Sequence, residues 1–521
     1  MSAQAPRGRV RLAELVAALS LGIDLGFGQP MEHVLRQCLI ALRLAERVGL
    51  DEESRAVVYY TALLIGVGCH SDAHEQAKWF GDDIEMKSHK YDPAFQAGGL
   101  RAAMAGLRSI GAGHPPLHRF RVGLEFVMSG HREVDGMIAA HARLAKTFAE
   151  QLGLSRTVAD AVGSAYEQWD GRGWPGTLSG AEIPIAARIA SLAEYVEVAH
   201  RINGPRGVVA LTQRGGGKQF DPSLCRLLGE HVDRVVESLD SVGAWETVVS
   251  QEPALAVVLS DEQFDAALLA IANFIDLKSP YTLGHSAAVA QLAAAASNVL
   301  GLPASEIRTL RRAALVHAFG RLGVSNSIWD KPGPLGAGEW ERVRMQPYFT
   351  DRMLNQSAEL APLASIVAHC RERLDGSGYP RGIAGASIPR PGRILAAADV
   401  YQAMREPRPH RPAHSADDAA RLMRAEARSG RLDHEVVEAV LSAAGHQSRQ
   451  RRDGPAGLTA REVEVLRLLA RGLSTKQIAE KLVVSPKTAG NHIEHIYSKI
   501  NAKNRVAASL FAVEHGLLPE E

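Results

Sequence analysis

Three side chains with metal-binding groups stand close together in the first part of the chain. His70, Asp72 and His74 occupy alternate positions in the stretch HSDAH. Imidazole and carboxylate groups are common ligands of zinc and related divalent metals. The spacing raises the hypothesis of a metal cluster. The alternative is a polar loop and helix that cover a neighbouring pocket.

The four cysteines add nothing to such a cluster. Cys38, Cys69, Cys225 and Cys370 are far apart and form no Cys-x-x-Cys pair. The sequence therefore predicts neither a zinc knuckle nor a disulfide framework. Unpaired cysteines are typical of a reducing compartment, so a cytoplasmic protein is expected.

Composition restricts the partners of the chain. The formal net charge is +1, so no global field attracts the molecule to nucleic acid or to a membrane, and any DNA contact must come from a local surface. No apolar run approaches the ~20 residues that a membrane span needs, and no membrane partner is expected. Abundant Ala and Leu favour helices.

An internal repeat organises most of the chain. The segment that begins at Glu167 (EQWDGRGWPG) aligns with the one at Glu372 (ERLDGSGYPR), an offset of 205 residues. Upstream, His33 aligns with His285 at an offset of 252. The sequence thus predicts a tandem duplication: copy A at 10–245 and copy B at 262–445. Copy A carries an insertion around 70–120, between Cys69 and His141, of about 47 residues, the difference between the offsets.

The remaining tail belongs to neither copy. A polar, basic linker is expected at 446–457, followed by a domain at 458–521. Thr459 and Glu462 form a capping-box pattern, Ser474 opens a second helix, and Ser485-Pro486 begins a third. Two helices joined by a short turn, the second with polar outward residues, predict a helix-turn-helix.

The tail closely resembles the LuxR-type DNA-binding domain, through LTAREVEVLRLLARGLSTKQIAEKLVVSPKTAGNHIEHIYSKI. The resemblance implies that the third helix enters the major groove of double-stranded DNA. Asn can read an adenine edge and Lys neutralises phosphate. By resemblance, the DNA-facing residues are Lys487, Thr488, Asn491, His492 and Lys499.

The last helix of the tail raises the question of oligomeric state. Val506, Leu510 and Val513 recur at helical spacing. They can supply a dimer contact, which would strengthen DNA binding by a domain that is only slightly basic. The alternative is packing onto their own domain. A homodimer is the expected state.

Copy B resembles the HD-GYP family of metal-dependent phosphodiesterases, through LVHAFGRLGVSNSIWDKPGPL, ERLDGSGYP and IPRPGRILAAADVYQAM. Copy A resembles it more weakly, through QWDGRGWP and IPIAARIASLAEYVEV. The family is helical and cleaves cyclic di-GMP or related cyclic dinucleotides. The expected fold is therefore mainly α: two HD-type helical domains in tandem plus a C-terminal LuxR-type helix-turn-helix bundle.

The resemblance also implies a ligand set that copy B keeps only in part. Two or three adjacent metals need an early His, a His-Asp pair, a middle His, two adjacent His and a late Asp. Copy B keeps His285, His317 and Asp399 as vestigial metal candidates. The remaining ligand positions hold Ala318, Gln346, Cys370 and Arg371.

Arg371 opposes a dication at this position by Coulomb repulsion. It can instead replace the metal charge, by pairing with Asp399 or by holding a phosphate. A divalent metal in copy B remains an alternative.

Copy A has lost more of the ligand set. The His-Asp pair is Ile65-Gly66, the adjacent histidines are Ala165-Tyr166, and the late Asp is Glu194. Ile and Ala cannot bind metal. The sequence therefore predicts that copy A is not catalytic.

The retained loop of copy B suggests a use other than catalysis. Glycines in DGSGYP permit a tight turn, which accounts for the loop without a function. Alternatively, the loop borders a pocket for a small-molecule effector. The candidate pocket residues are Arg371, Glu372, Asp375 and Tyr379.

The sequence favours a DNA-binding transcription regulator. Its catalytically degenerate HD-GYP-like region would act as a sensor of a small-molecule or protein effector, or as a dimerisation module. The alternative is a working metal-dependent cyclic di-GMP phosphodiesterase with an attached DNA-binding domain. Ala318 separates the two, because a bridging carboxylate is missing there.

Overall fold

The computed structural model describes residues 10–92, 110–111, 116–126, 131–239, 243–253, 257–446, 455–502 and 504–517. The chain divides into two compact units, Met1–His446 and Gln447–Glu521. The described residues form helices, with three isolated β-bridges and no sheet. None of the helices described is long and apolar enough to cross a membrane.

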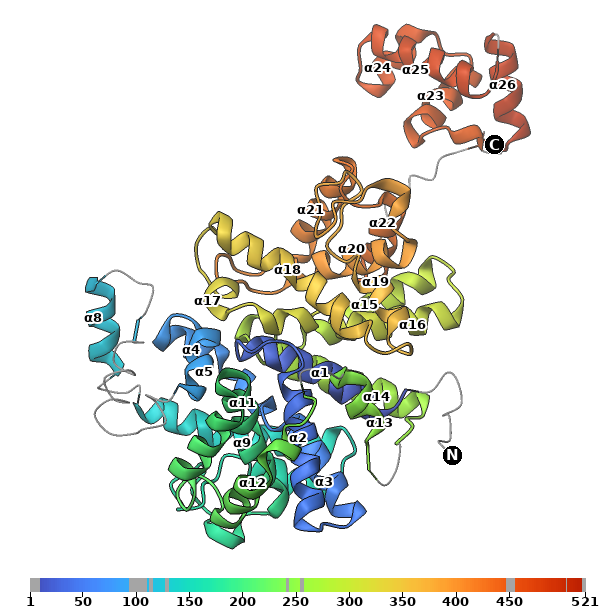
Figure 1. Ribbon diagram of the computed structural model, residues 1–521. Coiled ribbons are helices and arrows are strands. Elements are labelled where there is room, and N and C mark those ends of the chain that lie inside the picture. The colour runs from blue at the N-terminus through green and yellow to red at the C-terminus, as the bar shows by residue number, and fades with distance from the viewer. Residues whose placement is uncertain are drawn as a thin grey trace. The chain divides into compact units, whose positions relative to one another are not determined.

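Copy A forms the first half of the larger unit (Figure 1). Its α-helices are α1 Leu12–Gly26, α2 His33–Val48, α3 Glu52–Leu64, α4 Ala73–Phe80, α5 Asp83–Ser88, α8 Pro116–Glu125, α9 His131–Gln151, α10 Arg156–Gly163, α11 Ile185–Gly215, α12 Pro222–Val235 and α13 Ala244–Ser250. Short 3₁₀ helices are η1 Val67–His70, η2 His89–Tyr91 and η4 Gly180–Glu182. The chain breaks α11 at Gly204, where φ is +61° ahead of Pro205.

Copy B forms the second half of this unit. Its α-helices are α14 Asp261–Asp276, α15 His285–Val299, α16 Ala304–Val316, α17 Asn326–Trp329, α18 Ala337–Leu354, α19 Ala361–Val367, α20 Arg390–Arg405, α21 Ala416–Arg428 and α22 His434–Ala443. Its 3₁₀ helices are η5 Pro280–Thr282, η6 Phe319–Gly323 and η7 Gly385–Ser387. Helices α2, α3 and η1 begin 252 residues before α15, α16 and η6, and α10 and α11 begin 205 residues before α19 and α20.

The two copies also share contacts at equivalent positions. A Cβ at Gly68 would lie 2.5 Å from the His141 carbonyl oxygen, and a Cβ at Gly320 would lie 1.9 Å from that of Gln346. A side chain at either glycine would collide with backbone, so both positions need glycine for η1 and η6 to pack on α9 and α18. The repeat in the sequence is thus matched by a repeat in the packing.

One hydrophobic core joins the copies. It contains buried residues from Val10 to Leu441. Helix α1 packs on η6 and α18 as well as on α2 and α3. The insertion adds polar contacts, because buried Asp83 in α5 accepts hydrogen bonds from the Lys278 ammonium (3.0 Å) and the Asn326 N–H (2.7 Å). The two copies therefore form a single structural unit.

The smaller unit contains a four-helix bundle. Its helices are α23 Ala460–Ala470, α24 Thr475–Leu482, α25 Pro486–Lys499 and α26 Arg505–Glu514, preceded by η8 Pro455–Gly457. The expected caps are present: Thr459 and Glu462 form a capping box on α23, and Ser474 and Ser485 cap α24 and α25. These local signals confirm the predicted helix-turn-helix, and its core is separate from that of the larger unit.

Candidate functional site

Three residues of copy B form a group of potential metal ligands. His285 opens α15, His317 follows α16, and Asp399 lies in α20. Their ligand atoms lie within 4.8 Å of one another, and all three are buried. The Asp399 carboxylate is 3.0 Å from His285 Nε2 and 3.5 Å from His317 Nε2. Among the described residues this is the one His, Cys, Asp or Glu group with such geometry. It offers a site for one divalent metal.

The second metal position does not fit the residues present. Arg371 Nη1 lies 2.5 Å from Asp399 Oδ2. The guanidinium therefore bonds the carboxylate oxygen that His285 does not contact. Gln346 donates its side-chain N–H to the His317 carbonyl at 2.8 Å. Ala318 carries no ligand atom, and Cys370 is fully buried. A dinuclear centre therefore lacks both its bridging carboxylate and its remaining ligands.

The charges of this group support one another. Burial opposes ionisation of Asp399, but Arg371 and the two histidines outweigh it and hold the pKa of this carboxyl well below its usual value. Burial likewise opposes protonation of His285, yet the carboxylates of Asp399 and Glu406 raise the pKa of its imidazole. The charged groups of this site thus favour one another's ionised forms.

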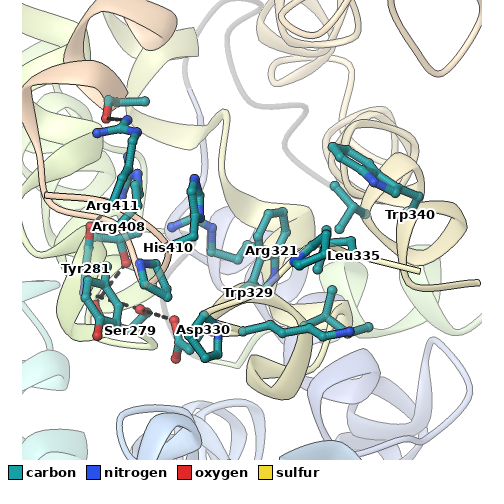
Figure 2. Close-up of a pocket in the computed structure, with 18 of the residues that line it drawn as sticks. Ser279, Tyr281, Arg321, Trp329, Asp330, Leu335, Trp340, Arg408, His410 and Arg411 are labelled. Carbon is teal, nitrogen blue, oxygen red and sulfur yellow. Dashed lines mark hydrogen bonds between the residues drawn. The ribbon is translucent and has the colours of Figure 1, made fainter. Parts of the chain in front are cut away.

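His285, Arg371 and Asp399 line a cavity of about 580 Å³. Figure 2 shows other side chains of its wall, among them Arg321, Trp329 and Arg408. Its wall carries several cationic and aromatic side chains. Arg321 lies over the Trp329 ring, 4.9 Å from its centroid. Arg408 donates to the Tyr281 carbonyl and to Glu406. The cationic and aromatic lining includes Tyr281, His285, Arg321, Trp329, Lys331, Trp340, Arg371, Tyr379, Arg408, His410 and Arg411.

Arg321 is the unusual member of this wall. It is 7% exposed, and its Nε and Nη1 have no hydrogen-bond partner among the residues described. Burial is the largest influence and lowers the pKa of this guanidinium to about 10, so it is still charged at neutral pH. A buried arginine with unpaired donors beside a cavity is suited to an anionic ligand.

The four pocket residues expected from the sequence are not all on the wall. Arg371 and Tyr379 line the cavity. Glu372 is buried and accepts the Arg381 N–H at 2.8 Å. Asp375 accepts the N–H and the hydroxyl of Ser377. The two carboxylates hold the loop, and they are not among the residues that line the cavity.

The equivalent carboxylate of copy A has different partners. Glu194 lies in α11 at the position that Asp399 has in α20, and it accepts hydrogen bonds from the Lys90 ammonium (2.7 Å) and the Tyr91 hydroxyl (2.8 Å). Both donors come from η2 in the insertion. Lys90 and Glu194 line a cavity of about 250 Å³. The carboxylate is thus neutralised by a lysine from outside the repeat.

Comparison with known proteins assigns the larger unit. The HD domain family matches residues 131–224 and 270–436. The 3′3′-cGAMP-specific phosphodiesterase 3 of Vibrio cholerae is 30% identical over 416 residues, which cover 79% of this chain and 90% of that protein. The chain belongs to the HD domain family.

Further HD domain relatives agree with this assignment. A crystal structure of a cyclic GMP-AMP specific phosphodiesterase from V. cholerae (V-cGAP3) superposes with a TM-score of 0.58 at 27% identity, covering 84% of this chain and 98% of that one. The cyclic di-GMP phosphodiesterase PA4108 of Pseudomonas aeruginosa is 36% identical over 179 residues, 34% of this chain and 43% of that protein. The smaller unit matches the luxR family of bacterial regulatory proteins at 456–512, so it is a DNA-binding domain.

The expected DNA-facing residues lie along α25. Lys487, Thr488 and Asn491 are exposed, and His492 is half-buried. The Thr488 hydroxyl is 2.8 Å from that of Ser485, so it also takes part in the cap. The Lys499 ammonium donates hydrogen bonds to Glu462 (2.7 Å) and to the Gly457 carbonyl (3.0 Å). The first of these bonds links the end of α25 to α23.

The residues near position 70 of the HD region do not converge. Asp72 bonds His141, and His74 Nδ1 lies 2.8 Å from Asp330 of copy B. His70 is buried, and neither ring nitrogen has a hydrogen-bond partner in the described part of the chain. The three side chains make separate contacts, so the hypothesis of a metal cluster there is wrong. The insertion instead lines the copy A cavity with Met86, Lys87, His89 and Lys90.

Sequence reasoning missed three functional candidates. Lys90 has no counterpart in copy B, so the repeat gave no signal for it. Arg408 lies in the EPRPHRP stretch of copy B, and the sequence did not indicate that the cations of this stretch meet the cavity. The contact of Cys69 with His141 joins residues far apart in the chain, and only the fold brings them together.

Proposed function

We propose that this chain is a DNA-binding transcription regulator in which two tandem HD domains bind an effector instead of cleaving a substrate. The HD region spans 10–245 and 262–445, and the DNA-binding domain follows a linker at 446–457. The effector site is the cavity of copy B. Its ligand is an anionic small molecule, a cyclic dinucleotide.

One observation carries this proposal. The Arg371 guanidinium bonds the Asp399 carboxylate at 2.5 Å, in the position where a metal would need that oxygen. A fixed positive charge there repels a dication and attracts a phosphate. Together with Ala318 in place of a bridging carboxylate, it favours binding over hydrolysis.

The cavity suits a cyclic dinucleotide chemically. Such a ligand carries two phosphates and two bases. Arg321 offers unpaired N–H donors and Lys331 a further cation, while Tyr281, Trp329 and Trp340 offer flat faces for bases. The volume of about 580 Å³ lies within the ordinary range of ligand pockets, roughly 300–1,000 Å³. The relatives named for 3′3′-cGAMP and cyclic di-GMP support this class.

Calorimetry with EDTA present tests the proposal. We expect 3′3′-cGAMP or cyclic di-GMP to bind the purified chain without metal, and to be recovered intact. Arg321→Gln should weaken binding at least tenfold, about 1.4 kcal/mol. Arg428→Gln, an exposed site that does not line the cavity, is the matched control. Binding that requires Mn²⁺, or that is unaffected by Arg321→Gln, would contradict the proposal.

The DNA-binding domain would act as a homodimer. Val506, Leu510 and Val513 of α26 are 76%, 57% and 61% exposed, while Ala508 and Ala512 pack inward. Packing onto their own domain therefore does not account for the three larger side chains. Their apolar row supports a dimer contact, which would place two copies of α25 on successive half-sites.

Two substitutions test how α25 reads DNA. Lys487 and Asn491 are four residues apart and share one helix face. On an operator selected from random DNA, Asn491→Ala should weaken specific binding by about 1–3 kcal/mol and leave non-specific binding nearly unchanged. Lys487→Ala should weaken both and reduce the salt slope by roughly one. Equal losses of specific and random-DNA binding in Asn491→Ala would contradict base reading.

A second candidate function is a metal-dependent cyclic-dinucleotide phosphodiesterase with an attached DNA-binding domain. The observation that favours it is the buried group of His285, His317 and Asp399, which can hold one divalent metal. Metal analysis of the purified chain distinguishes the candidates, because this chemistry uses two adjacent metals.

A further inference from the structure

A second reactive cluster lies in copy A, away from the effector cavity. Cys69 lies in η1, His141 lies in α9, and Asp72 follows η1. Cys69 and His141 share a hydrogen bond, and His141 Nε2 bonds the Asp72 carboxylate. The Tyr166 hydroxyl is 3.0 Å from the Cys69 sulfur. The order thiol, imidazole, carboxylate is the order that activates a cysteine nucleophile.

The fold holds this cluster in place. Gly68 lets the backbone of η1 approach the His141 carbonyl, at a distance that no larger residue permits. The Tyr166 hydroxyl also lies 2.8 Å from the Ile65 carbonyl, which fixes its ring beside the sulfur. Asp72 and His141 are both buried. Cys69 is half-buried and lines the cavity of about 250 Å³.

Charge favours the thiolate at Cys69. Burial opposes its ionisation, but His141 and Lys90 outweigh burial and lower the pKa of this thiol. The pKa of His141 is raised to about 10, against its burial, by Cys69 and Asp72, so the ring is an imidazolium at neutral pH. Burial raises the pKa of Cys225 to about 11 and that of Cys370 to about 12. The other groups facing Cys69 are Tyr166, Glu194 and Tyr195.

We propose that Cys69 is a nucleophilic modification site, at which small α,β-unsaturated carbonyl compounds enter the copy A cavity and add to the sulfur. The thiolate attacks the β-carbon and forms a C–S bond. The electrons of the C=C bond move toward the carbonyl oxygen. His141 then gives its proton to the α-carbon. No oxidant and no leaving group is needed.

The cavity favours this class of ligand over an oxidant. Its wall is rich in apolar and aromatic side chains, which suit an organic molecule. Lys90 also lines it, and an ammonium there stabilises the negative oxygen that forms during addition. Cys69 is the one cysteine among the described residues that line the cavity, so no neighbouring thiol is at hand to form a disulfide after oxidation. The aromatic wall residues are Phe27, Tyr166, Trp174 and Tyr195.

Limited labelling of the full-length chain with N-ethylmaleimide tests the proposal. The rate at each cysteine is read by peptide mass spectrometry. We expect Cys69 to react with N-ethylmaleimide about ten times faster than Cys225 or more. The ratio of the two rates should be larger with N-ethylmaleimide than with hydrogen peroxide. Equal rates at Cys69 and Cys225 would overturn the proposal. Faster reaction of Cys69 with peroxide than with maleimide would overturn the ligand class.

Variants show whether Cys69 reacts quickly because of its neighbour His141 or only because its sulfur is accessible. His141→Gln keeps the size of the side chain but removes the imidazolium, and it should slow labelling of Cys69 at least tenfold. An unchanged rate in a variant with a native circular dichroism spectrum would overturn the role of His141. Because His141 is buried, a second readout uses the native chain: thiolate absorbance near 240 nm at pH 7, which Cys69→Ser should remove and Cys225→Ser should not. Absence of that difference would also overturn the proposal.

Discussion

Copies A and B use the same helices and the same carboxylate position, yet they neutralise that carboxylate differently. In copy B the cation is Arg371, which follows α19 within the repeat and bonds Asp399. In copy A it is Lys90, which the insertion brings to Glu194. A buried carboxylate without a metal needs another positive charge. Two different changes in the chain thus satisfy one requirement.

The cavities of the two copies also differ, in volume and in the side chains that line them. That of copy B is about 580 Å³ and carries arginines with unpaired donors. That of copy A is about 250 Å³, because residues of α5 and η2 form part of its wall, and it contains a thiol beside an imidazolium. The larger cavity suits reversible binding of an anion, and the smaller one suits a small reactive molecule.

The largest effect is expected on the free energy of unfolding, when the Arg371–Asp399 ion pair loses one partner. Asp399→Ala leaves the half-buried Arg371 without its carboxylate and should lower the free energy of unfolding by about 3–5 kcal/mol. Asp417→Ala, at an exposed position, should change it by no more than about 0.5 kcal/mol. Denaturant unfolding measures both. Similar small effects would mean that the pair in copy B carries little of the structure.

The pH dependence of this effect follows from the depressed pKa of Asp399. A carboxyl of this kind contributes stability above its unfolded pKa, about 3.9. That contribution is lost as the pH falls through the lower, folded value. The stability difference between the native chain and Asp399→Ala should therefore stay constant from pH 7 to about 5 and shrink below pH 4.

The next difference between the copies should appear in their affinity for a divalent metal. Arg371→Ala frees Asp399 beside His285 and His317, so affinity for Co²⁺ should rise at least tenfold, about 1.4 kcal/mol. Lys90→Ala should give no such gain, because copy A has Ile65 and Ala165 at ligand positions. The visible spectrum of bound Co²⁺ reports both. A gain of Co²⁺ affinity in Lys90→Ala would contradict this difference between the copies.

The last comparison concerns how firmly a buried glutamate holds the Gly/Pro-rich loop of each copy. Glu167 accepts hydrogen bonds from the N–H groups of Gly176, Thr177 and Leu178, whereas Glu372 accepts one, from Arg381. Glu167→Gln should therefore cost about 1–3 kcal/mol, and Glu372→Gln about 1 kcal/mol or less. Thermal unfolding of the two variants measures the difference. The reverse order would show that the loop of copy B is held more tightly than its contacts indicate.

The sequence predicted the elements better than it predicted the pockets. The capping patterns at Thr459, Ser474 and Ser485 are local, so they could be read directly, and the constant offsets gave the equivalent helices of the two copies. Arg371 was expected to replace a metal charge or hold a phosphate, and the structure shows it on Asp399. These inferences rest on short-range signals or on alignment.

The rest depends on contacts that the sequence does not encode locally. Glu372 and Asp375 were expected at the pocket, but each side chain turns back to bond its own loop. The insertion has no second copy for comparison, so the role of Lys90 could not be inferred. The failure of His70, Asp72 and His74 to converge has the same origin, since their partners come from α9 and from copy B.

We propose that protein cations have replaced the metals in both copies, so that the HD region binds a cyclic dinucleotide without cleaving it. This replacement is tested most directly by incubating the purified full-length chain with Mn²⁺ or Fe²⁺ and either 3′3′-cGAMP or cyclic di-GMP, and separating linear products by chromatography. We expect no linear dinucleotide above the level found without protein. Turnover that disappears in His317→Ala would contradict it.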